Sequence, residues 1–367
     1  SSPASALVVY VDKDATGAGN GSSWADAFTT IQPAVDAAAA GGGGEVWVAE
    51  GVYDEVRTAN ASGSLETRAG VFLLGGFFGD ETEKDERSII IHQSVIDGSI
   101  ARMGNPSYHV VIASDNAGLD GFTIQGGYTA PTTTADPDYN ASGAGILIDN
   151  CSPIIQNCIF RNNTAQRIGG GAFILRASAA RFIHCVFEHN HAEFRGGAAF
   201  VHRYGTTESL TPEFSNCLFL LNSVGAVPHQ TGSAIKSEQM TDINIINCRF
   251  EQNLSGSTTV DLENTHSQVV NCLFIANTAD SALSLMGPNK SDVINCTFHN
   301  NANYAMSVNQ GINRIANSII WGNGFGINIL STPEPIVEFS VIQGGFVGAG
   351  NIDLNPLFVD SVAGDYH

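Results

Sequence analysis

The most regular feature of the sequence is a short phrase in which apolar and polar residues alternate and which ends on asparagine. It reads NCIFRNN from Asn157, and similar phrases begin at His184, Asn216, Asn247, Asn271 and Asn295. Alternation of this kind predicts a β-strand with one buried face. In one copy we expect Ile246, Cys248 and Phe250 to share that face.

The phrase recurs at intervals that are typical of a solenoid. Counted from Cys158, successive cysteines of the phrase are 27, 32, 31, 24 and 24 residues apart. A period of about 20 to 35 residues with variable inserts indicates a repeat architecture. We therefore predict an all-β, right-handed parallel β-helix of roughly ten coils, with equivalent residues stacked about 4.8 Å apart.

Two columns of side chains are predicted to be structural. The cysteines of the phrase are interpreted as small core residues, because stacked parallel side chains do not point their Cβ atoms at each other for a disulfide. They are Cys158, Cys185, Cys217, Cys248, Cys272 and Cys296. The asparagine that ends each phrase is expected at a turn, in the left-handed conformation, with its amide bonded to the next coil. These residues are Asn163, Asn190, Asn222, Asn253, Asn277 and Asn301.

The ends of the solenoid differ from its middle. Residues 29–40 read as a short amphipathic helix with Ile31 and Val35 on its buried side, followed by a strand over 45–48, and this helix is expected to cap the first coil. We divide the chain into a cap with the first strand (1–50), the β-helix (51–345) and an end segment (346–367). From Trp321 onward the phrase loses its Cys and Phe, which predicts a looser end.

Three irregular inserts interrupt the repeat, at residues 128–142, 203–212 and 224–231. On a regular stack, such inserts are expected to build walls beside a groove.

Charge and hydropathy restrict the partners. The 367 residues carry 16 Lys and Arg against 36 Asp and Glu, a formal net charge of −20. Such a surface repels nucleic acid and anionic membranes. The chain has no apolar run of about 18 residues that could span a membrane. It opens SSPASALVVYVD, like a mature N-terminus after signal removal, and we expect a secreted or cell-surface protein.

The repeat resembles that of a known group. Phe-x-x-Asn followed by Gly-Gly-Ala, as at Gly170 to Ala172, is similar to the repeat of polymorphic outer-membrane proteins and, more broadly, to bacterial β-helix surface proteins with C-terminal anchors. The stretches YVDKDATGAGNGSSWADAFTTIQPAVDAA and NPLFVDSVAGDYH resemble the two ends of that group. The resemblance implies the fold and secretion, and an anchoring or sorting domain beyond residue 367 if the chain continues. Its members include adhesins and relatives of polysaccharide-cleaving enzymes.

Basic residues gather in one part of this acidic chain: Arg161, Arg167, Arg176, Arg181, Arg195 and Arg203, with His184, His189, His191 and His202. One interpretation is a uronate-binding groove in which an arginine is the base of a β-elimination. Alignment of the coils favours structural ion pairs instead. It places Arg161 over Glu188, Arg167 over Glu193, Arg181 over Glu213 and Asp149 beside Arg176.

The residues left without an evident partner are the candidates for ligand binding. They are His191, Arg195, His202 and Arg203, with Tyr128 and Tyr204 as aromatic candidates on the inserts. No cofactor is expected. Calcium in the turn from Asp12 to Gly17 is the weaker alternative, because an EF-hand loop would need a third acidic ligand and a closing Glu.

Catalytic signatures are missing from the repeats: there is no Asp-Asp pair or repeated carboxylate column, and no Ser-His-Asp or Cys-His arrangement. We therefore expect an extracellular β-helix protein with an adhesive, structural or polysaccharide-binding role. The partner would be a polysaccharide or a cell-surface molecule, and self-assembly is a further expectation. The alternative is a polysaccharide lyase or glycoside hydrolase that uses a groove near Arg195 and His202.

Overall fold

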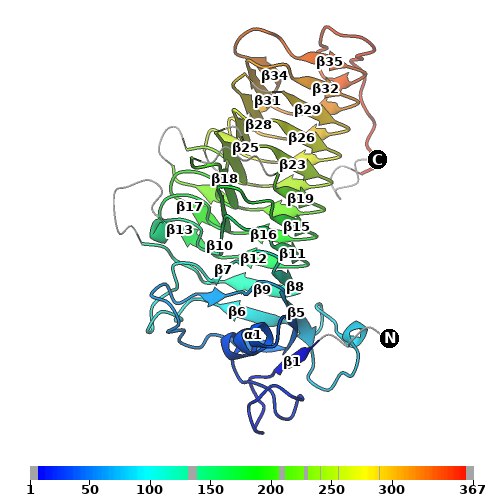
Figure 1. Ribbon diagram of the computed structural model, residues 1–367. Helices are drawn as coiled ribbons and strands as arrows, with labels where there is room; N and C mark the ends of the chain where they lie inside the picture. Colours follow the sequence, from blue (N-terminus) through cyan, green and yellow to red (C-terminus); the bar gives the residue numbers. More distant parts are fainter. Residues whose placement is uncertain are drawn as a thin grey trace.

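The protein is a right-handed parallel β-helix, as the repeat predicted (Figure 1). A computed structural model describes residues 7–130, 139–205, 211–226, 230–239, 241–254, 256–288 and 290–360. Its described strands form three long parallel sheets of 12, 11 and 10 strands, here called sheets A, B and C, and a short sheet of 3 strands. These numbers agree with the expected ten or so coils.

Sheet A comprises β1 (Val8–Val11), β2 (Gly44–Ala49), β5 (Val71–Phe77), β8 (Gly118–Asp120), β11 (Ile154–Gln156), β15 (Arg181–Ile183), β19 (Glu213–Ser215), β23 (Ile243–Ile246), β26 (Ser267–Val270), β29 (Ser291–Ile294), β32 (Arg314–Ala316) and β35 (Ile336–Glu338). Sheet B comprises β3 (Gly51–Tyr53), β6 (Ser94–Asp97), β9 (Phe122–Gln125), β12 (Ile159–Arg161), β16 (Val186–Glu188), β20 (Leu218–Leu220), β24 (Arg249–Glu251), β27 (Leu273–Ile275), β30 (Thr297–His299), β33 (Ile319–Trp321) and β36 (Val341–Ile342).

Sheet C comprises β4 (Leu65–Glu66), β7 (Val111–Ile112), β10 (Ile146–Asp149), β14 (Ala172–Leu175), β18 (Ala199–His202), β22 (Ile235–Glu238), β25 (Thr258–Glu263), β28 (Ser281–Met286), β31 (Tyr304–Asn309) and β34 (Phe325–Ile329). The short sheet comprises β13 (Thr164–Ala165), β17 (His191–Ala192) and β21 (Ser223–Val224). It lies between sheets B and C along the path of the chain.

Among the residues that the structure describes, three short helical segments accompany the strands. The helix α1 (Ile31–Ala40) caps the first coils, with Ile31, Ala34, Val35 and Ala38 buried, as predicted for this segment (Figure 1). The other two are single 3₁₀ turns, η1 (Lys84–Glu86) and η2 (Tyr139–Ala141). Within the described residues, no helix is long and apolar enough to cross a membrane.

A one-residue bend joins sheet A to sheet B, and it corrects the predicted alternation. Asn247 occupies this bend with φ of 54°. A left-handed residue reverses the side of the backbone on which the next side chains lie. Ile245 is therefore buried, whereas Ile246 faces outward, and Cys248 and Phe250 return to the core.

The predicted core columns are confirmed. The cysteines of the phrase are buried free thiols. The rings of Phe160, Phe187, Phe219, Phe250, Phe274 and Phe298 stack with centroids 4.5 to 5.0 Å apart. Burial raises the pKa of the Cys158 thiol well above its usual range, so the thiol stays protonated.

The asparagine column forms the predicted amide ladder, here called the inner ladder. In one rung, Asn190 Nδ2 donates to Asn222 Oδ1 at 3.1 Å and to the carbonyl of Phe160 at 2.8 Å. The expected left-handed conformation is wrong for these residues. It occurs one position earlier, for example at His189 and Leu221, so the turn residue and the ladder residue are neighbours.

The bends between sheets A and B carry a second asparagine column that the sequence analysis did not identify, here called the outer ladder. Asn216, Asn247, Asn271 and Asn295 are exposed, and each of the last three donates through Nδ2 to the Oδ1 of the one before it, at 3.0 to 3.2 Å. Each of them has a φ of 54° or 55°.

The C-terminal coils are more exposed than the middle ones. The strand β34 has no buried residue, and the side chains of Phe325 and Phe339 are exposed. The domain boundaries at residues 50 and 345 stay predictions. Of the inserts, residues 131–138, 206–210 and 227–229 lie outside the described residues, so the walls of the expected groove also stay a prediction.

Candidate functional site

The outer face of sheet C changes its chemistry from coil to coil. In one outward column, the register aligns Leu147, Phe173, Phe200, Lys236, Asp261 and Ser284. In the adjacent outward column, Leu175 is followed by His202 and then by Glu238. Two apolar columns thus become charged over β18, β22 and β25 and then polar, whereas the core columns keep one residue type over many coils.

Lys236 is the centre of this charged region. It is 2% exposed although it lies on the outside of the sheet, because neighbouring side chains cover it. Its Nζ lies 2.6 Å from Glu263 Oε2, 2.9 Å from Asp261 Oδ2 and 3.7 Å from Glu238 Oε2. Burial opposes the charge of Lys236, but the carboxylates of Asp261 and Glu263 outweigh it and raise its pKa above the usual value. The ammonium group therefore remains charged and fully engaged.

Glu238 links Lys236 to two candidates from the sequence. Arg195 Nη1 donates to both carboxylate oxygens of Glu238, at 3.1 and 3.2 Å, and His202 Nε2 lies 3.6 Å from Oε1. The carboxylate of Glu238 is 12% exposed, and burial raises its pKa although Lys236 and Arg195 act in the opposite direction. Glu263 is 46% exposed, and the hydrogen bond from Lys236 lowers its pKa. The two carboxyl groups thus sit in different environments.

His202 and Tyr204 form the apolar side of the same region. The Nδ1 atom of His202 accepts the backbone N–H of Tyr204 at 2.9 Å, and the two rings stack with centroids 3.5 Å apart. With Nδ1 as acceptor, the neutral ring carries its proton on Nε2, the atom that faces Glu238. Beneath Tyr204, Phe173 and Phe200 form a small apolar cluster outside the main core. This cluster fixes the ring of Tyr204 from one side.

We call Arg195, His202, Lys236, Glu238, Asp261 and Glu263 the charged cluster. It brings together Arg195 and His202 from the sequence candidates, and a third candidate, Tyr204, stacks on His202. The expectation that Arg195 and His202 have no partner is wrong, because both meet Glu238 on the following coil. Glu238 was overlooked because the inserts at 203–212 and 224–231 lengthen this coil and disguise the stacking of β18 on β22.

The other three candidates are not part of the charged cluster, although Arg203 directly follows its member His202. His191, on β17, bonds Ser223 Oγ through Nδ1 at 2.9 Å, and its Nε2 lies 3.6 Å from Glu193, so it also has partners. Tyr128 is 44% exposed, and its hydroxyl accepts a hydrogen bond from Gln166. Arg203 follows β18 and is half-buried, and it too has an interaction partner. Roles in ligand binding stay predictions for all six candidates.

The arginines that were expected to be structural meet acidic or polar groups. Arg176 pairs with Asp149, and Arg181 lies 3.8 Å from Glu213, as predicted. Arg161 stacks on Glu188 in the register as predicted, but its Nε donates to Gln125 on the other side at 2.8 Å.

The fourth predicted ion pair rested on a register that is wrong by one residue. Ile168 pairs with Arg195, which places Arg167 opposite Phe194. Ala172 likewise stacks on Ala199, so that Gly170 meets Gly197 and not Gly196.

The described residues give no support to a resident metal ion. Among them, no group of three or more His, Cys, Asp and Glu side chains has an arrangement that could hold one. In the charged cluster the three carboxylates surround an ammonium group. In the turn that was considered for calcium, Asp12 Oδ1 accepts the backbone N–H of Asp14. Calcium at this turn stays a prediction.

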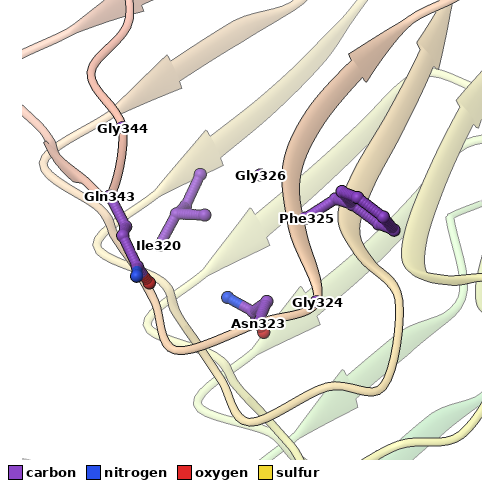
Figure 2. Close-up of a pocket in the computed structure, with 7 residues that line it drawn as sticks. All are labelled: Ile320, Asn323, Gly324, Phe325, Gly326, Gln343 and Gly344. Carbon is purple, nitrogen blue, oxygen red and sulfur yellow. The ribbon is translucent and has the colours of Figure 1, made fainter.

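A hollow near the C-terminal end has no ionisable lining. It lies between the turn at Asn323 and the loop at Gln343, with a volume of about 210 Å³ (Figure 2). Its lining residues are Ile320, Asn323, Gly324, Phe325, Gly326, Gln343 and Gly344. The inner ladder reaches its last rung here, where Asn323 Oδ1 accepts from Asn301. This hollow therefore marks the end of a structural column and offers no acid, base or nucleophile.

Comparison with known proteins supports the fold. No protein-family model matches the sequence, and no curated protein matches it either. Among solved structures, the chain is similar to the pectate lyase Pel9A, with a TM-score of 0.51 and 13% identity over 99% of this chain and 85% of that chain. It is also similar to the A-module of the Azotobacter vinelandii mannuronan C-5 epimerase AlgE6 (TM-score 0.45, 16% identity, 94% and 100% covered). A third is PfbA, a surface adhesin of Streptococcus pneumoniae (TM-score 0.40, 16% identity, 95% and 89% covered).

At 13% identity the likeness to Pel9A shows the parallel β-helix fold alone. The resemblance to the polymorphic outer-membrane repeat stays a prediction.

Proposed function

We propose that this chain is an extracellular β-helix protein that binds polysaccharide on the outer face of sheet C, at the charged cluster. One observation carries the proposal. Six ionisable side chains from the segment 195–202 and from β22 and β25 converge on a face whose neighbouring coils carry apolar or small polar residues. Such a break in a repeating column is not needed for the stack, because the coils before and after it stack without charges.

The chemistry of the charged cluster fits a ligand that is rich in hydroxyl groups. Exposed carboxylate oxygens of Glu263 accept hydrogen bonds, and Arg195, 48% exposed, can donate them. Tyr204 offers a ring that is already fixed by His202. Sugar-binding sites combine such convergent polar groups with an aromatic surface.

A second candidate is an adhesive or structural rod without a specific ligand at the charged cluster. The outer ladder and the paired arginines favour it, because these polar residues of the outer surface bond to residues on the neighbouring coil. Location outside the cell belongs to both candidates.

A binding test separates the two candidates. The wild-type chain is applied to an array of neutral and anionic polysaccharides, beside Arg195→Ala, Glu263→Gln and the control Glu251→Gln. Glu251 pairs with Arg249 on sheet B and lies outside the charged cluster. We expect binding that is lost in Arg195→Ala, weakened in Glu263→Gln and kept in the control. Equal binding by all four proteins, or no binding by the wild type, would contradict the proposal.

A further inference from the structure

We propose that the charged cluster also hydrolyses the glycosidic bonds of an uncharged polysaccharide, with Glu238 as the proton donor and Glu263 as the nucleophile. This inference rests on the proposed polysaccharide binding at the same face. It goes further in naming a reaction, two catalytic residues and a substrate class.

The positions of the two carboxyl groups suit a double displacement. Glu238 ends β22 and Glu263 ends β25, each directly after the paired residues Ser237 and Leu262. The two residues therefore occupy equivalent places on adjacent coils, about 4.8 Å apart along the rod. Both approach the same atom, Lys236 Nζ, at 3.7 and 2.6 Å. Glycosidases that act through a covalent intermediate hold their carboxyl groups about 5 to 5.5 Å apart.

The surroundings of the two residues assign their roles. Glu238 is sheltered and its pKa is raised by burial, which favours a carboxyl group that still holds its proton. Glu263 is open to solvent on one side, and its pKa is lowered by the hydrogen bond from Lys236, which favours a carboxylate that can attack. A pair of acids whose environments separate their pKa values is the arrangement that glycoside hydrolysis uses.

Two buried polar atoms at and next to the charged cluster, on Asp261 and Ser284, have no hydrogen-bond partner among the described residues. Asp261 is 4% exposed, and while its Oδ2 binds Lys236, its Oδ1 has no partner among the described residues. Ser284, its neighbour in the register and fully buried, has an unpartnered Oγ. Buried polar atoms without partners are costly. These two buried atoms are unused hydrogen-bonding capacity in and directly beside the charged cluster.

The reaction balances without a co-reactant other than water. In the first step, a Glu263 oxygen bonds to the anomeric carbon, the carbon–oxygen bond to the leaving sugar breaks, and the Glu238 proton passes to the leaving oxygen. In the second step, water attacks the anomeric carbon, its proton passes to Glu238, and the bond to Glu263 breaks. Both residues return to their starting states, and the anomeric configuration is retained.

The same contacts disfavour β-elimination on uronates. Elimination needs a base and a cationic group that is free to bind the substrate carboxylate. Lys236 is charged and bound by carboxylates, and Arg195 is bound to Glu238. With Glu238 protonated, the carboxylates of Asp261 and Glu263 balance the two permanent cations Arg195 and Lys236, so no excess positive charge remains to attract an anionic sugar.

The test uses the full chain and measures binding and cleavage separately. Soluble β-glucan, mannan, xylan and polygalacturonate are assayed by affinity electrophoresis for binding and by the release of reducing ends for hydrolysis. We expect cleavage of a neutral polymer, lowered at least 100-fold in Glu238→Gln and in Glu263→Gln, with the fold intact by circular dichroism and with Glu251→Gln fully active. Glu263→Ala in azide should regain turnover and release a glycosyl azide, which a structural role could not produce.

The outcomes distinguish the two proposals. A neutral polymer that is bound but not cleaved overturns hydrolysis and leaves the binding proposal standing. Unsaturated products from polygalacturonate overturn the assignment of the reaction. Cleavage that survives in Glu263→Gln overturns the assignment of the nucleophile. If none of the polymers is bound or cleaved, both proposals fail.

Discussion

The inner ladder and the charged cluster are both stacks of polar side chains on successive coils, yet they are built in opposite ways. The inner ladder repeats one residue, and each amide satisfies the next, so that Asn222 accepts from Asn190 and donates to Asn253. The charged cluster changes residue at every coil, and its members depend on particular partners of opposite charge. Phe200, Lys236 and Asp261 follow one another in a single column.

The difference shows where a solenoid can carry function. A residue that recurs on every coil needs no specially placed partner, because the same residue on the next coil is its partner. A column that changes chemistry within three coils gives up this mutual support and places unlike groups in contact. We take such a departure from the repeat as the indication of a site. The following experiments test that distinction, from the largest expected effect to the smallest.

The largest effect on stability should come from the inner ladder. Asn222→Ala removes the hydrogen bonds to Asn253 and to the carbonyl of Phe187, and leaves the Asn190 amide without its acceptor. Several buried groups lose partners at once, each at about 1 to 3 kcal/mol, so we expect a loss of about 4 kcal/mol in the free energy of unfolding. Urea denaturation measures it. A loss below about 1 kcal/mol would show that the inner ladder is not structural.

The next effect should come from the centre of the charged cluster. Lys236→Met leaves the carboxylates of Asp261 and Glu263 without their cation, and breaking a buried ion pair in this way costs about 3 kcal/mol or more. The triple variant with Asp261→Asn and Glu263→Gln should regain part of that loss, because no uncompensated charge remains.

The matched control for this change is Arg249→Met on sheet B. It breaks a half-exposed pair with Glu251 and should cost less than about 1 kcal/mol. Urea denaturation of the wild type, Lys236→Met, the triple variant and Arg249→Met measures these losses in the free energy of unfolding. Equal losses for Lys236→Met and Arg249→Met would contradict the prediction.

The pH dependence of stability should distinguish the two stacks, because amides do not titrate. The pKa of Glu263 is lowered from 4.5, so its contribution is present above that pH and is lost as the pH falls through the lower value in the folded state. The pKa of Glu238 is raised, so its contribution is present below 4.5 and is lost as the pH rises through the higher folded value. Glu263→Gln should thus flatten the acid side of the stability profile, and Glu238→Gln the side above 4.5.

Denaturation between pH 3 and 8 checks both signs against the wild type. His109, buried and with its pKa lowered to about 4, loses its own contribution as the pH falls from 6.5 toward 4. His109 is present in every protein of the series. The difference in unfolding free energy between a variant and the wild type at each pH therefore reports the contribution of the substituted glutamate alone. If Asn222→Ala changed the shape of the curve of unfolding free energy against pH as strongly as Glu263→Gln does, this account would be contradicted.

The smallest effect should come from the outer ladder. Asn247 is exposed and left-handed, with a φ of 54°, and glycine adopts that conformation without strain. Asn247→Gly should therefore change the unfolding free energy by less than about 0.5 kcal/mol. Asn247→Ala should cost about 1 kcal/mol, because alanine lacks the amide group that lets asparagine adopt the left-handed conformation. A change in Asn247→Gly as large as in Asn222→Ala would show that exposed and buried amide ladders are equivalent.

The sequence predicted whatever repeats. The core columns and the register of Phe160 on Phe187 follow from spacing alone, because every coil meets the same constraint. The capping helix α1 followed from its own amphipathic pattern. Prediction from the sequence failed at places where a single residue changes the path or the register of the chain. The left-handed bend at Asn247 moved Ile246 to the outside, and a register error of one residue misplaced Arg167 opposite Glu193.

Only two of the six residues of the charged cluster were identified from the sequence. Arg195 and His202 were selected because they appeared unpaired, and this reasoning found the correct region although both have a partner. Lys236, Glu238, Asp261 and Glu263 were overlooked because they are distant from the basic stretch along the chain. Their contact depends on the stacking of β18, β22 and β25, which the inserts conceal. A search for charged residues at equivalent positions after each Gly-Ser-Ala or Gly-Gly-Ala strand start would have found Lys236.

The buried cysteines have a consequence for how the protein folds. All seven are free thiols inside the closed coils, where burial keeps them from oxidants and from one another's disulfide chemistry. The unfolded chain exposes all seven at once, and any disulfide formed then would prevent the coils from closing. During refolding, closure of the coils therefore competes with oxidation of the thiols. A reductant should raise the yield of native protein, because it prevents disulfides from forming before the coils close. Once the coils have closed, the same protein should tolerate air indefinitely without it.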